Sequence, residues 1–357
     1  MTTMADILLL GTGAFAARIA FDLAVTGRQP TRVVIAGRNP LRSAWIRTAA
    51  NARSAIFGSP VRFETFAADL VAPGVPEAML RRFRPSVVVQ AASVQPGSVI
   101  AAADDGWARI VAEGGLSATA VFQLALSAGI ARALQDAHPQ AHLVNCCFPD
   151  VVNPMLAALG LPITCGTGNV GILANAFAGA TDQKVRVLSH YQNLAIWRQP
   201  PAMRHGRAPR VWLEDAEVPD VFARFPGVQL TVEPALDISG AAGVPLLLAM
   251  AHGHEWTGHV PGPMGLPGGY PVRWDGAALE LDLPAGLSRD EAVGWNAAFE
   301  AENGIVLEGT CARYTGRLHD MLHAHSPGLA AGFDLRHLDQ ALAAMQELRT
   351  RLQSGKV

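Results

Sequence analysis

Near its beginning the chain reads Ile7-Leu8-Leu9-Leu10-Gly11-Thr12-Gly13-Ala14-Phe15-Ala16-Ala17. The apolar run favours a buried strand, and residues 18–24 continue with the composition of a helix. A Gly-x-Gly-x-x-Ala turn between a strand and a helix is typical of a dinucleotide-binding fold, although a structural turn in another α/β protein would also fit. The stretch therefore predicts an α/β fold that begins with a strand, a glycine turn and a helix.

Each small residue of this motif has its own part in a dinucleotide site. Gly11 allows a tight turn out of the strand, and Gly13, which lacks a Cβ, lets a pyrophosphate approach the backbone at the helix N-terminus. Ala16 takes the position where helix and strand pack closely. We therefore predict that the turn and the first helical residues bind the cofactor, namely Gly11, Thr12, Gly13, Ala14, Phe15 and Ala16.

The end of the next expected strand, residues 32–36, indicates which dinucleotide is bound. An NAD enzyme usually places an acidic residue here to hold the ribose 2′-hydroxyl. This chain instead reads Gly37-Arg38-Asn39-Pro40, without a carboxylate. A guanidinium can pair with a 2′-phosphate and stack on the adenine, although Arg38 could equally be a surface arginine. We predict NADP rather than NAD, with Gly37, Arg38 and Asn39 in the cofactor site.

Length, charge and cysteine content limit the kind of protein further. The 357 residues suffice for two domains, and the formal net charge of −2 includes no long run of one sign. We therefore expect neither nucleic acid nor a membrane as a partner. The four cysteines form no CxxC pair and Met1 leads directly to a strand, so a reduced, cytoplasmic protein is expected. No metal is expected either, because His252, His254 and His259 lack the spacing of a metal site.

Strand and helix patterns alternate through about residue 180. Further strands are expected at residues 61–66, 86–90, 141–145 and 162–166, with helices at residues 75–83, 116–137 and 151–159. Six strands with helices between them predict a doubly wound parallel Rossmann sheet, in an NAD(P)-binding domain at residues 1–180. The fourth strand opens into a small-residue loop, 91–98. Because ligands bind outside the carboxyl ends of such strands, Ala91, Ala92 and Ser93 are predicted to border the cofactor.

The pattern changes after Asp182. A strand-like run at residues 185–191 precedes an Arg- and Pro-rich segment and an apolar helix pattern at residues 239–252. A loop rich in Gly and Pro follows at residues 261–272, and it could close over a site or simply join two strands. Helix and strand patterns then continue to a final helix at residues 334–353. We predict an α+β substrate and oligomerisation domain at residues 181–350, and a homodimer.

The order of these segments resembles the lactate/malate dehydrogenase superfamily over most of the chain. Asn145 ends the fifth strand as in that family's Asn-Pro motif, a Gly-x-Gly turn follows at Gly166-Thr167-Gly168, and His190 comes after the next strand like the family's catalytic histidine. The resemblance implies a Rossmann-fold dehydrogenase. One departure matters: the family's Asp-x-x-Arg, which orients the histidine and clamps a substrate carboxylate, is replaced by the uncharged residues 171–175.

A second resemblance concerns the front half. Ala36-Gly37-Arg38-Asn39 and the Val-Val-Val-Gln-Ala-Ala run at residues 87–92 are similar to the NADP domain of saccharopine-dehydrogenase-like reductases. That group reduces imines or carbonyls of amino-acid-like substrates. The resemblance implies, as an alternative, a saccharopine- or opine-type imine reductase in which no histidine acts. A non-catalytic NADP-binding sensor is the other alternative, since a fold does not guarantee a reaction.

Hydride transfer to a small polar metabolite needs a proton donor beside the reduced C=O or C=N bond. The ordinary pKa of histidine, near 6.5, suits His190 to that role, and Tyr191 could share it because alternation along a strand would place only one of the two in the cleft. A structural histidine at a domain junction is the alternative. We predict His190, Tyr191 and Asn145 as catalytic residues, with Asn145 bonding the cofactor carboxamide or the substrate.

The remaining predictions concern the nicotinamide and the substrate. Asn169 follows the second glycine turn and is predicted to line the nicotinamide pocket. Arg198 and Arg204 are predicted to recognise an anionic substrate, although solvated surface arginines would give the same pattern. The sequence as a whole predicts an NADP-dependent oxidoreductase that reduces a small, carboxylate-bearing metabolite.

Overall fold

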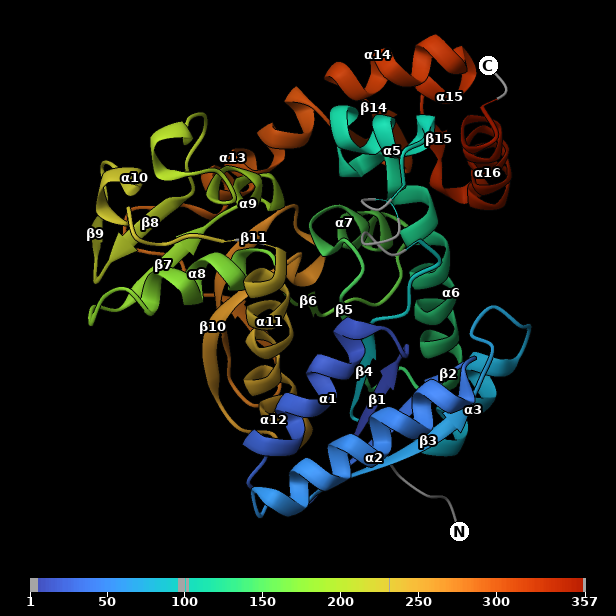
Figure 1. Cartoon of the computed structure of the whole chain (residues 1–357), viewed down its shortest axis with the longest axis vertical. Coiled ribbons are helices and arrows are strands. Elements are labelled where there is room, and N and C mark those ends of the chain that lie inside the picture. Colours follow the sequence, from blue (N-terminus) through green and yellow to red (C-terminus); the bar gives the residue numbers. More distant parts are fainter. Residues whose placement is uncertain (1–5, 96–99, 101–102, 231, 356–357) are drawn as a thin grey trace.

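The structure is a computed structural model that describes residues 6–95, 100, 103–230 and 232–355. Met1 and residues 96–98 of the predicted small-residue loop lie outside the described residues. Within them, six strands form one parallel sheet in the order β3-β2-β1-β4-β5-β6 (Figure 1). These strands are β1 (Ile7–Leu10), β2 (Thr31–Gly37), β3 (Val61–Ala67), β4 (Val87–Gln90), β5 (His142–Asn145) and β6 (Cys165–Gly166). The predicted doubly wound sheet is confirmed.

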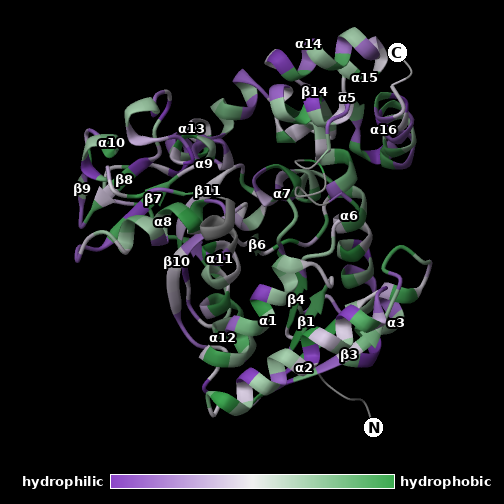
Figure 2. Ribbon diagram, viewed as in Figure 1, coloured by the Kyte–Doolittle hydropathy of each residue, from purple (hydrophilic) through white to green (hydrophobic). Residues whose placement is uncertain are grey.

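The centre of the sheet is buried on both faces. Every residue of β1 is inaccessible to solvent, as expected for an all-apolar parallel strand covered by helices, and Figure 2 shows the hydrophobic character of β1 and β4. β1 pairs with β2 on one side and with β4 on the other, so the strand order reverses there. The carboxyl ends of β1 and β4 therefore border the crevice in which ligands bind in this topology.

Helices cover both faces of the sheet. They are α1 (Ala14–Thr26), α2 (Pro40–Ile56), α3 (Val75–Phe83), α5 (Gly106–Arg109), α6 (Ala120–Ala137), α7 (Pro149–Ala158) and α8 (Val170–Ala178). A π-helical turn, Ile110–Gly114, and a 3₁₀ turn, Leu116–Thr119, lead from α5 into α6. Of the described chain, one segment, Leu116–Ala137, is long and apolar enough to cross a membrane, but 72% of its apolar window is buried inside the fold. Such burial is what a core helix shows.

The second half forms three small antiparallel sheets among the described residues. They consist of β7 (Val185–Leu188), β8 (Arg210–Leu213) and β9 (Ala216–Glu217); β10 (Trp256–Pro261), β11 (Gly269–Trp274) and β12 (Leu279–Leu281); and β13 (Ile305–Glu308), β14 (Cys311–Tyr314) and β15 (Phe333–Asp334). The helices between and after them are α9 (Tyr191–Trp197), α10 (Val221–Arg224), α11 (Val232–Ala242), α12 (Val244–His252), α13 (Arg289–Glu302), α14 (Gly316–His325), α15 (Pro327–Ala330) and α16 (Leu338–Gln353). The predicted α+β character of this half is confirmed.

Several element boundaries differ from the prediction. The strand expected at residues 185–191 ends at Leu188, because His190 caps α9: Gln192 N–H donates to His190 Nδ1 and Asn193 Oδ1 accepts from His190 N–H. The helix expected at residues 239–252 is two helices that meet at Gly243. The loop at residues 262–268 joins β10 to β11 as a hairpin, and Gly268 N–H donates to Asp150 O, which holds the loop on α7.

Two apolar clusters connect the halves of the chain. In one, Phe122 and Leu134 of α6 belong with Leu318 of α14 and Leu348 of α16 to a single buried cluster. In Figure 1 these C-terminal helices lie beside α5 and α6. In the other, the second face of the sheet and α1 pack with α12 and the β10–β12 sheet. The second half of the chain is therefore built onto the sheet domain through shared cores.

Candidate functional site

The glycine turn between β1 and α1 has the geometry of an anion-binding turn. Gly11 has φ +114°, and a Cβ there would lie 2.8 Å from Ala92 N and 2.9 Å from Ala91 O, so only glycine fits. A Cβ at Gly13 would meet nothing within 4 Å. Among the described side chains none caps α1 at Gly13, which leaves the first amides of this helix for a ligand. A pyrophosphate fits this open N-terminus.

The end of β2 supplies positive charge next to this turn. Arg38 is exposed and, within the described part of the chain, has no ion-pair partner. Arg42 Nε donates to Thr12 O at 3.3 Å, and its guanidinium lies 4.8 Å from the centre of the Trp45 ring. Asn39 uses its side chain to cap α2, accepting from Arg42 N–H at 2.9 Å. Two arginines thus follow β2 next to the glycine turn, and no carboxylate stands between Gly37 and Arg42 in the sequence.

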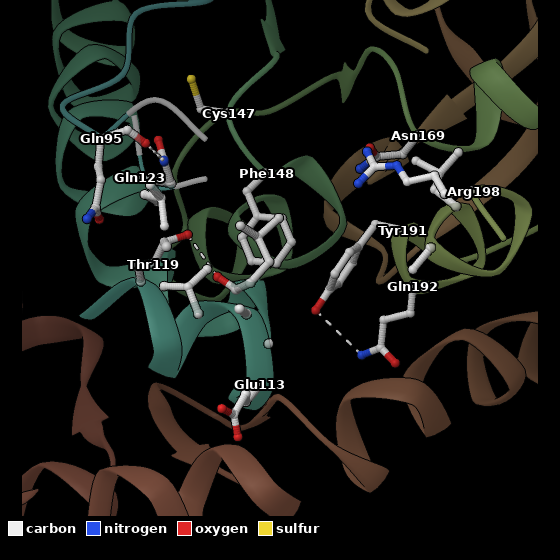
Figure 3. Close-up of a pocket in the computed structure, with 18 of the residues that line it drawn as sticks. Gln95, Glu113, Thr119, Gln123, Cys147, Phe148, Asn169, Tyr191, Gln192 and Arg198 are labelled. Atoms are coloured by element: carbon white, nitrogen blue, oxygen red, sulfur yellow. Dashed lines mark hydrogen bonds between the residues drawn. The ribbon is translucent and has the colours of Figure 1, made fainter. Parts of the chain in front are cut away.

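A cavity of about 1060 Å³ lies at the carboxyl ends of the sheet. Cys146 and Cys147 directly follow β5, Thr167 directly follows β6, and Phe15 comes from the first turn of α1. The opposite lining comes from the α5–α6 connection and from α9. The cavity lining as a whole also contains the charged residues Asp104, Asp105 and Arg109. Figure 3 shows further polar residues of the lining, namely Glu113, Thr119, Gln123, Asn169, Tyr191, Gln192 and Arg198.

Tyr191 contributes a phenolic hydroxyl to the residues that line this cavity. Its hydroxyl lies 3.2 Å from Ser117 Oγ and 3.5 Å from Gln192 Nε2, and its ring meets the edge of Phe148 with centroids 4.8 Å apart (Figure 3). Its backbone N–H donates to Asp150 Oδ1 at 2.9 Å. Burial raises the pKa of Tyr191 above its usual range, so the hydroxyl keeps its proton at neutral pH.

His190 does not reach the cavity. Its side chain is fully buried, stacks on Phe299 with centroids 4.9 Å apart, and places Nε2 3.5 Å from Glu300 Oε1. Burial lowers the pKa of His190 to about 3, so the ring is neutral. One residue of the pair His190 and Tyr191 is expected to face the cleft, and Tyr191 is the one that lines the cavity. The reason is the start of α9, which turns consecutive side chains in different directions.

Asn145 is also placed behind the cavity wall. Its Nδ2 donates to Asn153 Oδ1 at 2.8 Å, and its Oδ1 accepts from Cys147 N–H at 2.9 Å. These bonds hold the turn between β5 and α7, which leaves the cavity surface at this point to Cys146 and Cys147. Burial raises the pKa of Cys146 to about 12, so it presents a neutral thiol.

Asn169, which follows the second glycine turn, lies on the lining of the cavity. It has φ +38°, and its Nδ2 donates to Asp150 Oδ2. Asp150 is buried, and burial raises its pKa to about 6. Its two carboxylate oxygens thus hold the backbone of Tyr191 and the side chain of Asn169, two cavity residues from different elements. Asp150, in the first turn of α7, therefore positions both of these cavity residues.

The predicted small-residue loop stands behind the glycine turn. The backbones of Ala91 and Ala92 lie against Gly11, and Ala92 O accepts from Cys147 Sγ at 3.1 Å. Ser93 Oγ donates to Gln123 Oε1 at 3.0 Å. The structure brings this loop to the same sheet edge as the glycine turn, but these three residues support the cavity wall rather than line it.

The two predicted substrate arginines differ. Arg198 is exposed at the C-terminal end of α9 and lines the cavity beside Asn169 (Figure 3). Arg204 is 8% exposed, lies 4.4 Å from the centre of the Trp197 ring, and donates to backbone oxygens, including Val228 O at 2.6 Å. Because its donors are used inside the protein, Arg204 cannot recognise a substrate in the cavity. Arg109 is the second arginine of the lining.

Glu300 and Ser117 are the residues that the sequence did not reveal. Glu300 is 5% exposed on α13 and accepts from Ser117 Oγ at 2.7 Å. One signal was present: Ala292, Asn296 and Glu300 repeat every four residues on the buried face of a helix, and a charge on such a face is unusual. Its contact with Ser117 spans 183 positions and leaves no local pattern.

The histidines near residue 255 have structural partners. His252 bonds Thr31 Oγ1 at 2.9 Å, His254 bonds Gln29 Nε2 at 2.8 Å, and His259 Nε2 accepts from Val187 N–H at 2.9 Å. Within the described ranges, no group of three His, Cys, Asp or Glu side chains is placed to hold a metal ion.

Comparisons with known proteins agree with this architecture. No family model matches the chain, and no curated protein matches it in sequence. Among solved structures, a lactate dehydrogenase from Cryptosporidium parvum, complexed with lactic acid and nicotinamide adenine dinucleotide, is 16% identical with a TM-score of 0.52, over 84% of this chain and 96% of the other. A malate dehydrogenase from Picrophilus torridus in its apo form is 12% identical with a TM-score of 0.53, over 83% of this chain and 94% of the other. The chain thus has the fold of the lactate and malate dehydrogenases.

Proposed function

We propose that this protein is an oxidoreductase that uses a nicotinamide dinucleotide, NADP in preference to NAD, to reduce a C=O or C=N bond of a small, polar, carboxylate-bearing metabolite. One observation carries the proposal: the uncapped N-terminus of α1 and the open space at Gly13 adjoin a cavity lined by Tyr191 and Arg198. The fold of lactate and malate dehydrogenases supports it by analogy.

The residues at the sheet edge fit the dinucleotide. Gly11, Gly13 and the first amides of α1 would hold the pyrophosphate. Arg38 and Arg42 would face a 2′-phosphate at the end of β2, where a carboxylate would repel it. When bound in reduced form, the dinucleotide supplies a hydride.

Inside the cavity the chain's own residues provide a proton and positive charge. Tyr191 lines the cavity and keeps its phenolic proton at neutral pH, so it is suited to protonate the oxygen or nitrogen that gains negative charge. Arg198, exposed on the same lining, is suited to hold a substrate carboxylate. The carboxylate of Asp150 accepts hydrogen bonds from the Tyr191 backbone and the Asn169 side chain, which keeps both residues in place.

Reduction of an imine is the second candidate. Among the described residues that line the cavity none is a histidine, whereas the lactate/malate dehydrogenase resemblance implies a catalytic histidine there. This arrangement favours the saccharopine- or opine-type alternative, in which a C=N bond forms from a 2-oxo acid and an amine before it is reduced. A non-catalytic sensor would bind the dinucleotide without any turnover.

A substrate panel distinguishes these possibilities. NADPH oxidation is followed with pyruvate, oxaloacetate and 2-oxoglutarate, each alone and with ammonium or glycine. Turnover with an oxo acid alone supports C=O reduction, and turnover that requires the amine supports C=N reduction. NADPH binding is seen as a raised melting temperature. If NADPH binds but no mixture is turned over, the non-catalytic sensor is the remaining alternative and the enzymatic proposal is contradicted.

Tyr191→Phe tests the proton donor. Loss of the hydroxyl with the ring retained should lower kcat by about 10²–10⁴-fold, the usual contribution of a general acid, while the melting shift caused by NADPH stays the same. Tyr314→Phe is the matched control, because Tyr314 is buried but does not line the cavity. A Tyr191→Phe variant with normal kcat would assign the proton to another group.

A homodimer in the cytoplasm is part of the proposal. α2 exposes Leu41, Trp45 and Ile56, with 83%, 52% and 75% of their surfaces accessible, and a second copy would cover such a face. The cytoplasmic placement rests on the cysteine pattern, since four cysteines without a CxxC pair are typical of a reducing compartment. Light scattering of the purified protein should give twice the mass of one chain.

A further inference from the structure

A buried carboxyl group lies behind the cavity wall formed by Tyr191. Glu300 Oε2 accepts from Ser117 Oγ and from Ile305 N–H, each at 2.7 Å. Glu300 Oε1 accepts from Gln192 Nε2 at 3.3 Å and faces His190 Nε2 at 3.5 Å. The group is fixed from several elements and is shielded from solvent, since only 5% of Glu300 is exposed.

Ser117 connects this carboxyl group to the cavity. Its hydroxyl is fully buried and lies 2.7 Å from Glu300 Oε2 and 3.2 Å from Tyr191 Oη. A hydroxyl can donate one hydrogen bond while it accepts another. The three side chains therefore form a continuous hydrogen-bonded path from a buried acid to the phenol that lines the cavity.

The groups facing Glu300 do not neutralise it. His190 Nδ1 accepts from Gln192 N–H, so the single proton of the neutral ring is on Nε2, toward Glu300. Arg207 lies over the Phe299 ring and pairs with Glu302, and Asp150 bonds the Tyr191 backbone. Within the described chain, no arginine or lysine pairs with Glu300. Burial without a cation raises the pKa of Glu300 to about 7.

We propose that Glu300 replaces, through Ser117, the proton that Tyr191 gives to the product. This inference rests on the proposed function. In the carboxylate form Ser117 donates to Glu300 Oε2; in the protonated acid Glu300 Oε2 donates to Ser117 Oγ, and the Ser117 proton points to Tyr191 Oη. From this protonated form the Tyr191 O–H bond breaks as a product O–H or N–H bond forms; Ser117 then gives its proton to the phenolate oxygen, and Glu300 gives its own to Ser117. One proton moves from the carboxyl group to the product, and a carboxylate remains beside the neutral His190. Glu300 acts through other residues, so it is a positioning and proton-supplying residue.

The path predicts a definite pH dependence. In the direction of reduction Glu300 must be protonated, so kcat should fall as the pH rises through about 7, by about tenfold per unit above that value. In the direction of oxidation the carboxylate is required, so kcat should rise over the same range. Tyr191, whose pKa is raised, does not titrate in this window.

Glu300→Gln tests the proposal, because glutamine keeps the size and an accepting oxygen but cannot supply the proton. We expect kcat for NADPH oxidation, with the oxo acid that is active in the panel, to fall about tenfold or more and to lose its dependence on pH near 7, while KM and the melting shift with NADPH are kept. Glu302→Gln is the matched control on the same helix, since Glu302 is exposed and pairs with Arg207. A Glu300→Gln variant with the wild-type pH profile would overturn the proposal.

Ser117→Ala tests the connection. It keeps the acid but breaks the path, so it should lower kcat as much as Glu300→Gln does, and the double variant should be no slower than either single one. Additive losses would overturn the path. Infrared spectra give a readout without substrate: a protonated carboxylic acid band should titrate near pH 7 and be absent in Glu300→Gln. If that band titrates but no mixture is turned over, the proposed function fails; if turnover occurs and the band is missing, this inference fails.

Discussion

Arg38 is the residue on which the proposed preference for NADP depends. It is exposed beside the glycine turn, where Arg42 bonds Thr12 O. NADPH should raise the melting temperature more than NADH at equal concentration, and Arg38→Asp should reverse that order, because a carboxylate repels the 2′-phosphate and can hold a 2′-hydroxyl. Arg47→Asp, further along α2, is the control with the same charge change. Equal shifts with both dinucleotides in the wild type would remove the argument for NADP.

His190 contributes to stability in a way that pH reveals. Its pKa is about 3 in the folded chain and about 6.5 when unfolded, so the unfolded chain binds more protons in this interval and the folded state loses stability as the pH falls below about 6.5. His190→Gln lacks this titration. The difference in unfolding free energy between wild type and variant should therefore shrink by about 2 kcal/mol between pH 7 and pH 5.

Urea unfolding at several pH values measures this difference. Asp150 and Glu300, whose raised pKa values act in the opposite sense, are present in both proteins and their contributions cancel to first order. A difference that does not change with pH would mean that His190 titrates normally in the folded chain.

At the scale of elements, the β1–α1 turn contains two glycines that meet different requirements: Gly11 the backbone conformation, and Gly13 the space for a ligand. Gly11→Ala should destabilise the fold, because its φ is +114° and the new Cβ would lie within 2.9 Å of the Ala91 and Ala92 backbone. Gly13→Val should leave the melting temperature of the free protein within a few degrees, because nothing lies within 4 Å, yet it should weaken NADPH binding by filling the approach to α1. Thermal unfolding with and without NADPH separates the two effects; a Gly13→Val variant that binds normally would contradict the cofactor position.

The elements also show how much of the fold and of the cavity lining the sequence can predict. Residues 7–17 and the alternation that follows predict the sheet because they rest on local chemistry: apolar strands, a glycine turn, helix patterns. Tyr191, Asn169 and Arg198 were found among the cavity residues because they follow recognisable turns and strands. In the sequence, Arg204 and His190 resemble these cavity residues in their local setting. Their partners, Val228 O and Glu300, come from distant segments and hold them away from the cavity. Local patterns do not record such partners.

At the scale of the whole molecule, the shared cores make the two halves one cooperative unit. Leu348 of α16 is 2% exposed and belongs to the cluster that contains Phe122 of α6. Leu348→Ala should cost about 2–5 kcal/mol and lower the melting temperature of the sheet domain as well, with one transition in calorimetry. Val71→Ala, at an exposed position between β3 and α3, is the control. Two separate transitions, of which only one responds to Leu348→Ala, would show that the halves unfold independently.

The cluster that joins α6 to α14 and α16 has a consequence for engineering by recombination. A chimera cut near residue 180, which gave this sheet domain the second half of a lactate or malate dehydrogenase, would lose the side chains of α16 that cover α6 and would expose Phe122 to water. A working graft must therefore transfer α6 together with α14 and α16, or redesign both surfaces at once. The packing of these helices, and not a boundary along the sequence, therefore decides which segments must be transferred together.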